Sequence, residues 1–199
     1  MPRIPVHDVD DAPVASQQAL QGLQRRMGTL LNIHAEMAHS PVVLSAYTGM
    51  QQAIGEHGTF DTKTREAIAL TVAAVDHCEY CLAAHTGSAR KAGWTEQDTI
   101  SIRAGQIDFD DRLAALLSVA AETAGGVGYV EDATWKAALD AGWSTEQLAE
   151  AFAHVMANVF TNFFNHYAGT ELDVPAAPPL PQLTGQPPAA MNAAPAKDA

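Results

Sequence analysis

The sequence is poor in basic residues and has no long apolar run. Its 11 Lys and Arg stand against 23 Asp and Glu, which gives a formal net charge of -12. Such a surface repels phosphate backbones and anionic lipid headgroups, so we expect neither nucleic acid nor a membrane as a partner. The longest apolar stretch, 67–75, is about half of what a bilayer requires, and the N-terminal residues lack the apolar core of a secretory signal. We therefore expect a cytoplasmic protein.

Alternating strand patterns and Asn-Gly hairpin signals are also absent, and the sequence predicts an all-α fold. Ser40 and Pro41 resemble an N-cap and a proline at the first helical position, which opens a helix to about residue 54. Asp61 or Thr62 can cap a helix that runs to about residue 75. Gly93 can end one that begins near Cys78. Further helices are expected over 16–27, 95–104, 108–124, 131–141 and 145–167.

The chain divides into three parts by composition. Residues 1–15 are rich in Pro and Asp and are expected to form an extended arm, and 16–170 form a single helical domain. Residues 171–199 are rich in Pro and Ala and are expected to be a disordered tail. Inside the domain, the segments 89–94 and 138–143 both end in Ala-Gly-Trp after a helical stretch and precede a Thr-Glu-Gln sequence. This weak repeat is typical of a shared helix-turn-helix packing unit.

Only two cysteines are present, Cys78 and Cys81, and His85 follows the second after three intervening residues. On a helix, with Cys78 at 0°, Cys81 lies at about 300° and His85 at about 340°, so the three share an arc of about 60°. In the cytosol both thiols would be reduced. Two thiols at this spacing therefore indicate chemistry rather than a structural disulfide framework.

Each member of this group has a chemical role. Cys78 lies at the expected N-terminus of its helix, where unpaired N–H groups favour a thiolate. His85 lies one turn beyond Cys81 and can take its proton. The Cys-x-x-Cys spacing lets one sulfur attack the other after oxidation, which closes a disulfide.

Glu66 precedes an apolar stretch that indicates a buried helix. If its side chain faces inward, desolvation would raise its pKa and suit it to proton transfer near neutral pH. Alternatively, Glu66 is a solvated first-turn residue that the helix dipole favours.

The pattern Glu66-x11-Cys78-x2-Cys81-x3-His85 resembles the signature of the alkylhydroperoxidase D family, within the carboxymuconolactone decarboxylase-like superfamily. The surrounding Thr64-Arg-Glu-Ala-Ile-Ala-Leu and Leu82-Ala-Ala-His-Thr also fit it. The run Asn162-Phe-Phe-Asn-His is similar to a segment of its peroxidase-related members. The resemblance covers about 25–170 and implies an all-α protein that assembles as a trimer or hexamer.

For chemistry, the resemblance implies reduction of hydroperoxides through Cys78 and Cys81, with a proton relay through Glu66, Cys81 and His85. It favours Cys81 as the attacking thiol and Cys78 as the resolving one, whereas the helix terminus favours Cys78 as the more acidic thiol; the order stays open. Characterised members accept electrons from a thioredoxin-like or lipoylated donor. We therefore expect an external thiol reductant and no bound cofactor.

Other polar residues near this pattern are candidates for pocket or supporting positions: His77, Tyr80, Asn162, Asn165 and His166. The residues on the last helix could instead form a polar helix end at a subunit contact. His154 and His166 project about 120° apart and cannot form a ligand pair alone. A zinc site at His77, Cys78, Cys81 and His85 would lack a second ligand segment, so we expect no metal. His7, His34, His39 and His57 have no visible partners and are expected at the surface or as caps.

Three functions compete. The first is a thiol-dependent hydroperoxide reductase that serves in antioxidant defence. The second is a carboxymuconolactone decarboxylase-like enzyme, an activity for which a cysteine pair is not needed. The third is a redox-responsive oligomeric protein without peroxidase turnover.

Overall fold

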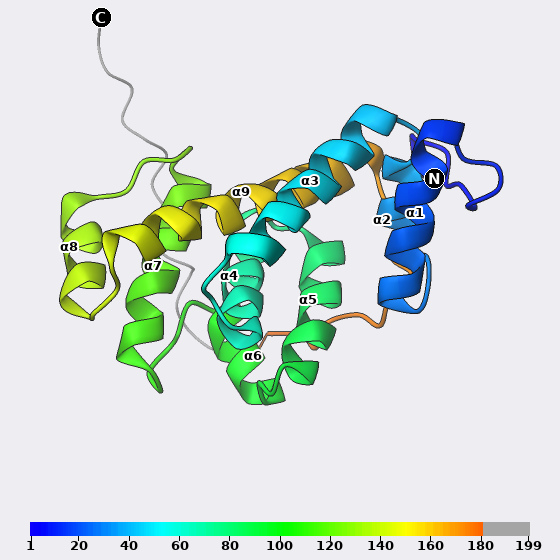
Figure 1. Ribbon diagram of the computed structural model, residues 1–199. Helices are drawn as coiled ribbons and strands as arrows, with labels where there is room; N and C mark the ends of the chain where they lie inside the picture. Colours follow the sequence, from blue (N-terminus) through cyan, green and yellow to red (C-terminus); the bar gives the residue numbers. More distant parts are fainter. Residues whose placement is uncertain (181–199) are drawn as a thin grey trace, which may run out of the picture.

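The computed structural model describes residues 1–180, which form nine α-helices and no strand (Figure 1). The helices are α1 (Val14–Met27), α2 (Asn32–Met37), α3 (Pro41–His57), α4 (Thr62–Val75), α5 (Glu79–Lys91), α6 (Glu96–Arg103), α7 (Asp111–Gly125), α8 (Asp132–Asp140) and α9 (Thr145–Ala168). The all-α prediction is confirmed, and eight helices coincide with expected ones to within a few residues. The short helix α2 was not expected from the sequence, because it has no side-chain N-cap of its own.

Helix α4 is the central element of the fold. Asp61 caps it by accepting a hydrogen bond from the Thr64 N–H at 2.8 Å. Every residue from 67 to 73 is buried, because α5, α6, α7 and α9 all pack against this helix. A helix that is apolar on all sides is stable only in such a position. The buried helix expected from the apolar run is therefore present, and α5 is its closest packing neighbour.

The internal repeat has a structural counterpart in two matched turns, between α5 and α6 and between α8 and α9. The Trp94 indole N–H donates to the Lys63 carbonyl at 2.9 Å, and the Trp143 indole N–H donates to the Arg112 carbonyl at 2.7 Å. The cationic side chain of the same Lys63 or Arg112 lies over each ring. The glycine before each tryptophan has a φ of 100° or 91°, which a residue with a side chain rarely adopts.

Helix α9 crosses the molecule from the α7–α8 end to the α1–α2 end (Figure 1). Its first half packs in one hydrophobic cluster with α4 and α7. Its second half contacts a separate cluster built by α1, α2, α3 and the start of α5, to which both cysteines belong. The long helix therefore brings Asn162, Asn165 and His166 next to the α4–α5 turn.

The two ends of the described chain lie against the domain. The Arg3 N–H donates to the Ala168 carbonyl at 2.7 Å. Residues 171–180 contain no helix or strand, yet Asp173 accepts hydrogen bonds from the Asn32 N–H at 2.7 Å and from the Tyr80 hydroxyl at 2.6 Å. The rest of the tail expected to be disordered, 181–199, lies outside the described residues. Within the part that the structure describes, no helix has the length and apolar character to cross a membrane.

Candidate functional site

The two cysteines meet at the turn between α4 and α5. Cys78 is the N-cap of α5, with extended backbone angles (φ -87°, ψ 96°), and its sulfur accepts the Cys81 N–H at 3.3 Å. The cap position places Cys78 just outside the helix, so its proximity to Cys81 comes from capping rather than from helical periodicity. The two sulfurs are 2.6 Å apart, and both thiols are free. Their residues are 1% and 3% exposed.

Helix α9 supplies a hydrogen-bond donor to both sulfurs. The Asn165 side-chain amide lies 3.1 Å from the Cys81 sulfur and 3.7 Å from the Cys78 sulfur. The Asn162 amide donates to the Asp76 carboxylate at 2.8 Å, and the His166 Nε2–H donates to the Asp76 carbonyl at 2.9 Å. Among the residues expected to support the site, Asn165 therefore contacts the thiols, while the other two hold the turn that precedes them.

One negative charge is shared unequally between the thiols. The hydrogen bond that Cys81 donates lowers the pKa of Cys78 to about 7, in spite of burial, and the Cys81 and Asn165 N–H groups add to this effect. The same hydrogen bond and burial raise the pKa of Cys81. Near neutral pH the structure therefore favours a thiolate on Cys78 that accepts the Cys81 S–H.

Glu66 and His85 form a hydrogen-bonded pair between α4 and α5. The Glu66 carboxylate oxygen lies 2.9 Å from the His85 Nδ1, and the two side chains are 18% and 28% exposed. Because α4 begins at Thr62, Glu66 lies in its second turn, and the first-turn alternative is wrong. The carboxylate accepts the Nδ1 proton, which leaves Nε2 as the free imidazole nitrogen.

Cys81 and His85 line the same small cavity, of about 100 Å³. No hydrogen bond joins His85 to either sulfur within residues 1–180. His34 on α2, Tyr47 on α3 and Tyr80 also line the cavity. The hydroxyl of Tyr80, an expected pocket residue, is already donated to Asp173.

His34 is a site residue that the sequence did not indicate. It was expected at the surface or as a cap, but it is 4% exposed and faces the Cys81 cavity. The sequence around His34 shows no regular spacing of apolar residues that would indicate a buried helix face. Its partner Tyr47 is 13 residues away, on another helix. His7 and His39, for which the sequence indicated no partner, stack on each other with ring centroids 5.2 Å apart.

His77 lies apart from the thiol group. It has a φ of 54° in the α4–α5 turn and lines a different cavity, of about 540 Å³, together with Glu79 and Arg103. The His, Cys, Asp and Glu side chains of residues 1–180 do not gather in any group of three or more that could hold a metal ion.

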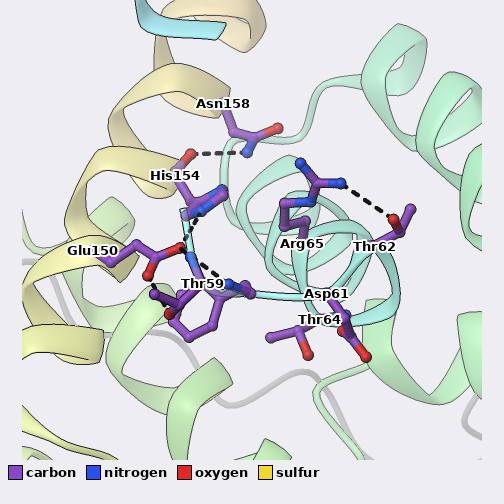
Figure 2. A network of polar contacts seen from close by, with 9 residues as sticks. Thr59, Asp61, Thr62, Thr64, Arg65, Glu150, His154 and Asn158 are labelled. Atoms are coloured by element: carbon purple, nitrogen blue, oxygen red, sulfur yellow. Dashed lines mark hydrogen bonds and ion pairs between the residues drawn. The ribbon is translucent and has the colours of Figure 1, made fainter. Parts of the chain in front are cut away.

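A polar cavity of about 210 Å³ is lined by Glu66 and His85 together with Arg65, His154 and Asn158. Figure 2 shows His154 between Asn158 and the Glu150 carboxylate, with Arg65 on the neighbouring helix. Burial lowers the pKa of His154, although Glu150 opposes this effect. His85 therefore lines both this polar cavity and the cavity of the thiols, whereas Glu66 lines only the polar one.

The fold and this arrangement define a class of all-helical proteins with a buried Cys-x-x-Cys pair and an adjacent Glu–His pair. Residues 41–111 match the model of the carboxymuconolactone decarboxylase family. This match supports the alkylhydroperoxidase D-like and carboxymuconolactone decarboxylase-like superfamily that the sequence pattern predicted.

Solved structures share the fold across most of the chain. A peroxidase-related protein from Ralstonia eutropha JMP134, with an alkylhydroperoxidase D core, has a TM-score of 0.77 and 21% identity, and the match covers 86% of this chain and 92% of the other. A peroxidase-related protein from Silicibacter sp. TM1040 has a TM-score of 0.71 and 21% identity, with coverage of 84% and 88%. The debrominase Bmp8 has a TM-score of 0.73 and 17% identity, with coverage of 86% and 91%. These likenesses concern the fold.

A curated relative, an uncharacterized protein from Haemophilus influenzae, is 45% identical over 49 residues. The match covers 25% of this chain and 43% of the relative.

Proposed function

We propose that the protein is a thiol-dependent hydroperoxide reductase that uses Cys78 and Cys81 as its redox pair. The observation that carries this proposal is the 2.6 Å contact between two buried, free sulfurs at the start of α5, with Cys81 on the wall of a small cavity. Two thiols at this distance can close a disulfide without movement of the backbone. The fold shared with peroxidase-related proteins supports the same reaction class.

The geometry favours Cys81 as the attacking thiol, because it lines the cavity and Cys78 does not. The Cys81 proton first moves across the sulfur contact to the Cys78 thiolate. The Cys81 thiolate then attacks the terminal oxygen of the hydroperoxide, which forms a sulfur–oxygen bond and breaks the oxygen–oxygen bond. The sulfur is oxidised to a sulfenic acid, and the peroxide is reduced to an alkoxide.

Cys78, now a thiol, resolves the sulfenic acid. Its sulfur attacks Cys81, water leaves, and the disulfide forms. The sum is one thiolate, one thiol, one hydroperoxide and one proton giving a disulfide, an alcohol and water. An external dithiol then restores the pair, and we expect a thioredoxin-like or lipoylated donor in this role.

The Glu66–His85 pair supplies the proton that this sum requires. His85 lines both the polar cavity and the Cys81 cavity, which supports a role in passing a proton between them. The Glu66 carboxylate holds the ring by Nδ1 and stabilises its charged form while a proton is in transit.

Two serine variants test the proposal. With tert-butyl hydroperoxide and a dithiol donor, Cys81→Ser should abolish turnover and trap no sulfenic acid. Cys78→Ser should also stop turnover, but it should consume one peroxide per chain and accumulate a sulfenic acid that dimedone labels. Undiminished turnover in Cys81→Ser would overturn the proposal. Release of CO₂ from a muconolactone that survives alkylation of both thiols would favour a decarboxylase instead, and a slow oxidation that no dithiol reverses would favour a redox-responsive protein.

A further inference from the structure

His34 and Tyr47 form a polar wall of the Cys81 cavity. The reaction proposed above assigns neither of them a role. His34 comes from α2 and Tyr47 from α3, and both line the cavity with Cys81 and His85. The His34 Nε2 lies 3.3 Å from the Tyr47 hydroxyl, with the ring centroids 5.3 Å apart. Neither residue belongs to the Cys-x-x-Cys pattern or to the Glu–His pair.

Burial keeps both members of the wall neutral. It lowers the pKa of His34 to about 4, an effect that Arg26 reinforces and Asp173 opposes. It also raises the pKa of Tyr47, with Arg26 acting against it. At neutral pH the imidazole is therefore uncharged and the tyrosine hydroxyl keeps its proton.

The hydrogen bonds of His34 indicate which nitrogen carries its proton. Its Nδ1 is buried and has no hydrogen-bond partner in the described part of the chain. A buried N–H without an acceptor is rarer and costs more than a buried lone pair without a donor. The proton therefore belongs on Nε2, which donates to the Tyr47 oxygen. The Tyr47 O–H is then left to donate into the cavity.

The size and lining of the cavity restrict what this hydroxyl can meet. Its volume of about 100 Å³ is below the roughly 300–1,000 Å³ of pockets for drug-sized ligands. Three apolar residues, Leu31, Ile33 and Ala84, are among those that line it. Such a cavity suits a neutral molecule of a few non-hydrogen atoms with a short apolar part and an oxygen that accepts a hydrogen bond.

We propose that Tyr47 donates a proton to the leaving oxygen of a small hydroperoxide while Cys81 attacks the other oxygen, and that His34 positions the Tyr47 hydroxyl for this transfer. The proposal rests on the reductase function above. When the oxygen–oxygen bond breaks, the electron pair passes to the alkoxide, which takes the Tyr47 proton and leaves as an alcohol. The His34 Nε2–H stabilises the resulting tyrosinate, and His85 returns a proton to it through the same cavity.

The test compares two peroxides that differ in their leaving group. tert-Butyl hydroperoxide expels an alkoxide, which needs a proton, whereas peracetic acid expels acetate, which does not. Tyr47→Phe removes only the hydroxyl. The rate of Cys78–Cys81 oxidation, followed by rapid quench and mass spectrometry, should fall about 100-fold with tert-butyl hydroperoxide and less than about threefold with peracetic acid. His34→Phe should show the same selective loss to a smaller degree.

Tyr80→Phe is the matched control, because Tyr80 lines the same cavity but its hydroxyl is committed to Asp173. Its ratio of the two rates should equal that of the wild type. If Tyr47→Phe lowers both rates equally, or neither, the proton-donor role is overturned while the reductase function stands. If the wild-type thiols react with neither peroxide, the reductase function fails and the inference fails with it.

Discussion

The Glu66 carboxylate accepts the Nδ1 proton of His85 at 2.9 Å and so ties α4 to α5 beside the thiols. His85 lines two cavities, a polar one that it shares with His154 and a smaller one that it shares with Cys81. This relationship favours the tautomer of the imidazole with its proton on Nδ1, and the proposed proton route to the buried thiol pair rests on it.

Glu66→Gln tests the route. The substitution preserves the shape of the side chain but removes the charge that stabilises a protonated His85. We expect kcat/KM for tert-butyl hydroperoxide to fall by about 10- to 100-fold, with little change in unfolding free energy. The control is Glu56→Gln, which alters an exposed carboxylate on α3 and should leave the rate unchanged. An unchanged rate in Glu66→Gln would exclude the relay.

Asn165→Leu tests the hydrogen bonds that α9 donates to the sulfurs. Without the amide the thiolate loses a donor, so the pKa of Cys78 should rise by roughly one pH unit from about 7. Alkylation by iodoacetamide, measured against pH, reports this pKa directly. Asn158→Ala removes an amide from the same helix that donates to a backbone carbonyl instead, and its profile should match that of the wild type. A Cys78 pKa that stays near 7 in Asn165→Leu would show that the amide does not stabilise the thiolate.

His34 should make stability depend on pH. Its folded pKa is about 4, against an ordinary value of 6.5. Between these values the unfolded chain binds a proton that the folded chain does not, so folding free energy is lost as the pH falls from 6.5 towards 4. Urea denaturation measures the unfolding free energy that is lost between pH 6.5 and pH 4. This loss should be about 3 kcal/mol smaller in His34→Phe than in the wild type. Parallel pH curves would mean that His34 is not buried as a neutral group.

Asp173 stabilises α2 from outside its own sequence. No side chain of its own segment caps α2, and Asp173 accepts the Asn32 N–H and the Tyr80 hydroxyl instead. Asp173→Ala should lower the unfolding free energy by about 1–2 kcal/mol in urea titrations. Asp140→Ala, which removes only an exposed ion pair with Lys136, should change it by less than about 0.5 kcal/mol. If the two variants lowered the unfolding free energy equally, Asp173 would not act as a cap of α2.

Local patterns carried most of the fold prediction. Caps such as Asp61 and the Ala-Gly-Trp turns set helix ends through neighbouring residues, so helix positions followed from the sequence. The helix α2 did not, because its cap comes from Asp173, 141 residues away. The tail that contains Asp173 has the composition of a disordered segment. Composition alone cannot predict that one of its residues forms a long-range hydrogen bond.

The candidate site was predictable to the extent that it lies on one stretch of chain. The thiol pair lies at the start of α5 and His85 lies further along the same helix, so their spacing predicted that they lie close together. Cys78 proved to be the cap rather than a helical residue, which the periodicity of α5 could not distinguish. His34 and Tyr47 reach the cavity from two other helices, and no spacing rule connects them to Cys81.

The fate of the thiols in a single turnover tests the central claim most directly. The reduced protein is mixed with one equivalent of tert-butyl hydroperoxide without a donor, then alkylated, digested and mapped by mass spectrometry. We expect one equivalent of tert-butanol, both cysteines protected from alkylation, and one peptide that carries the Cys78–Cys81 disulfide. Recovery of both thiols in alkylated form, with the peroxide unconsumed, would contradict the account.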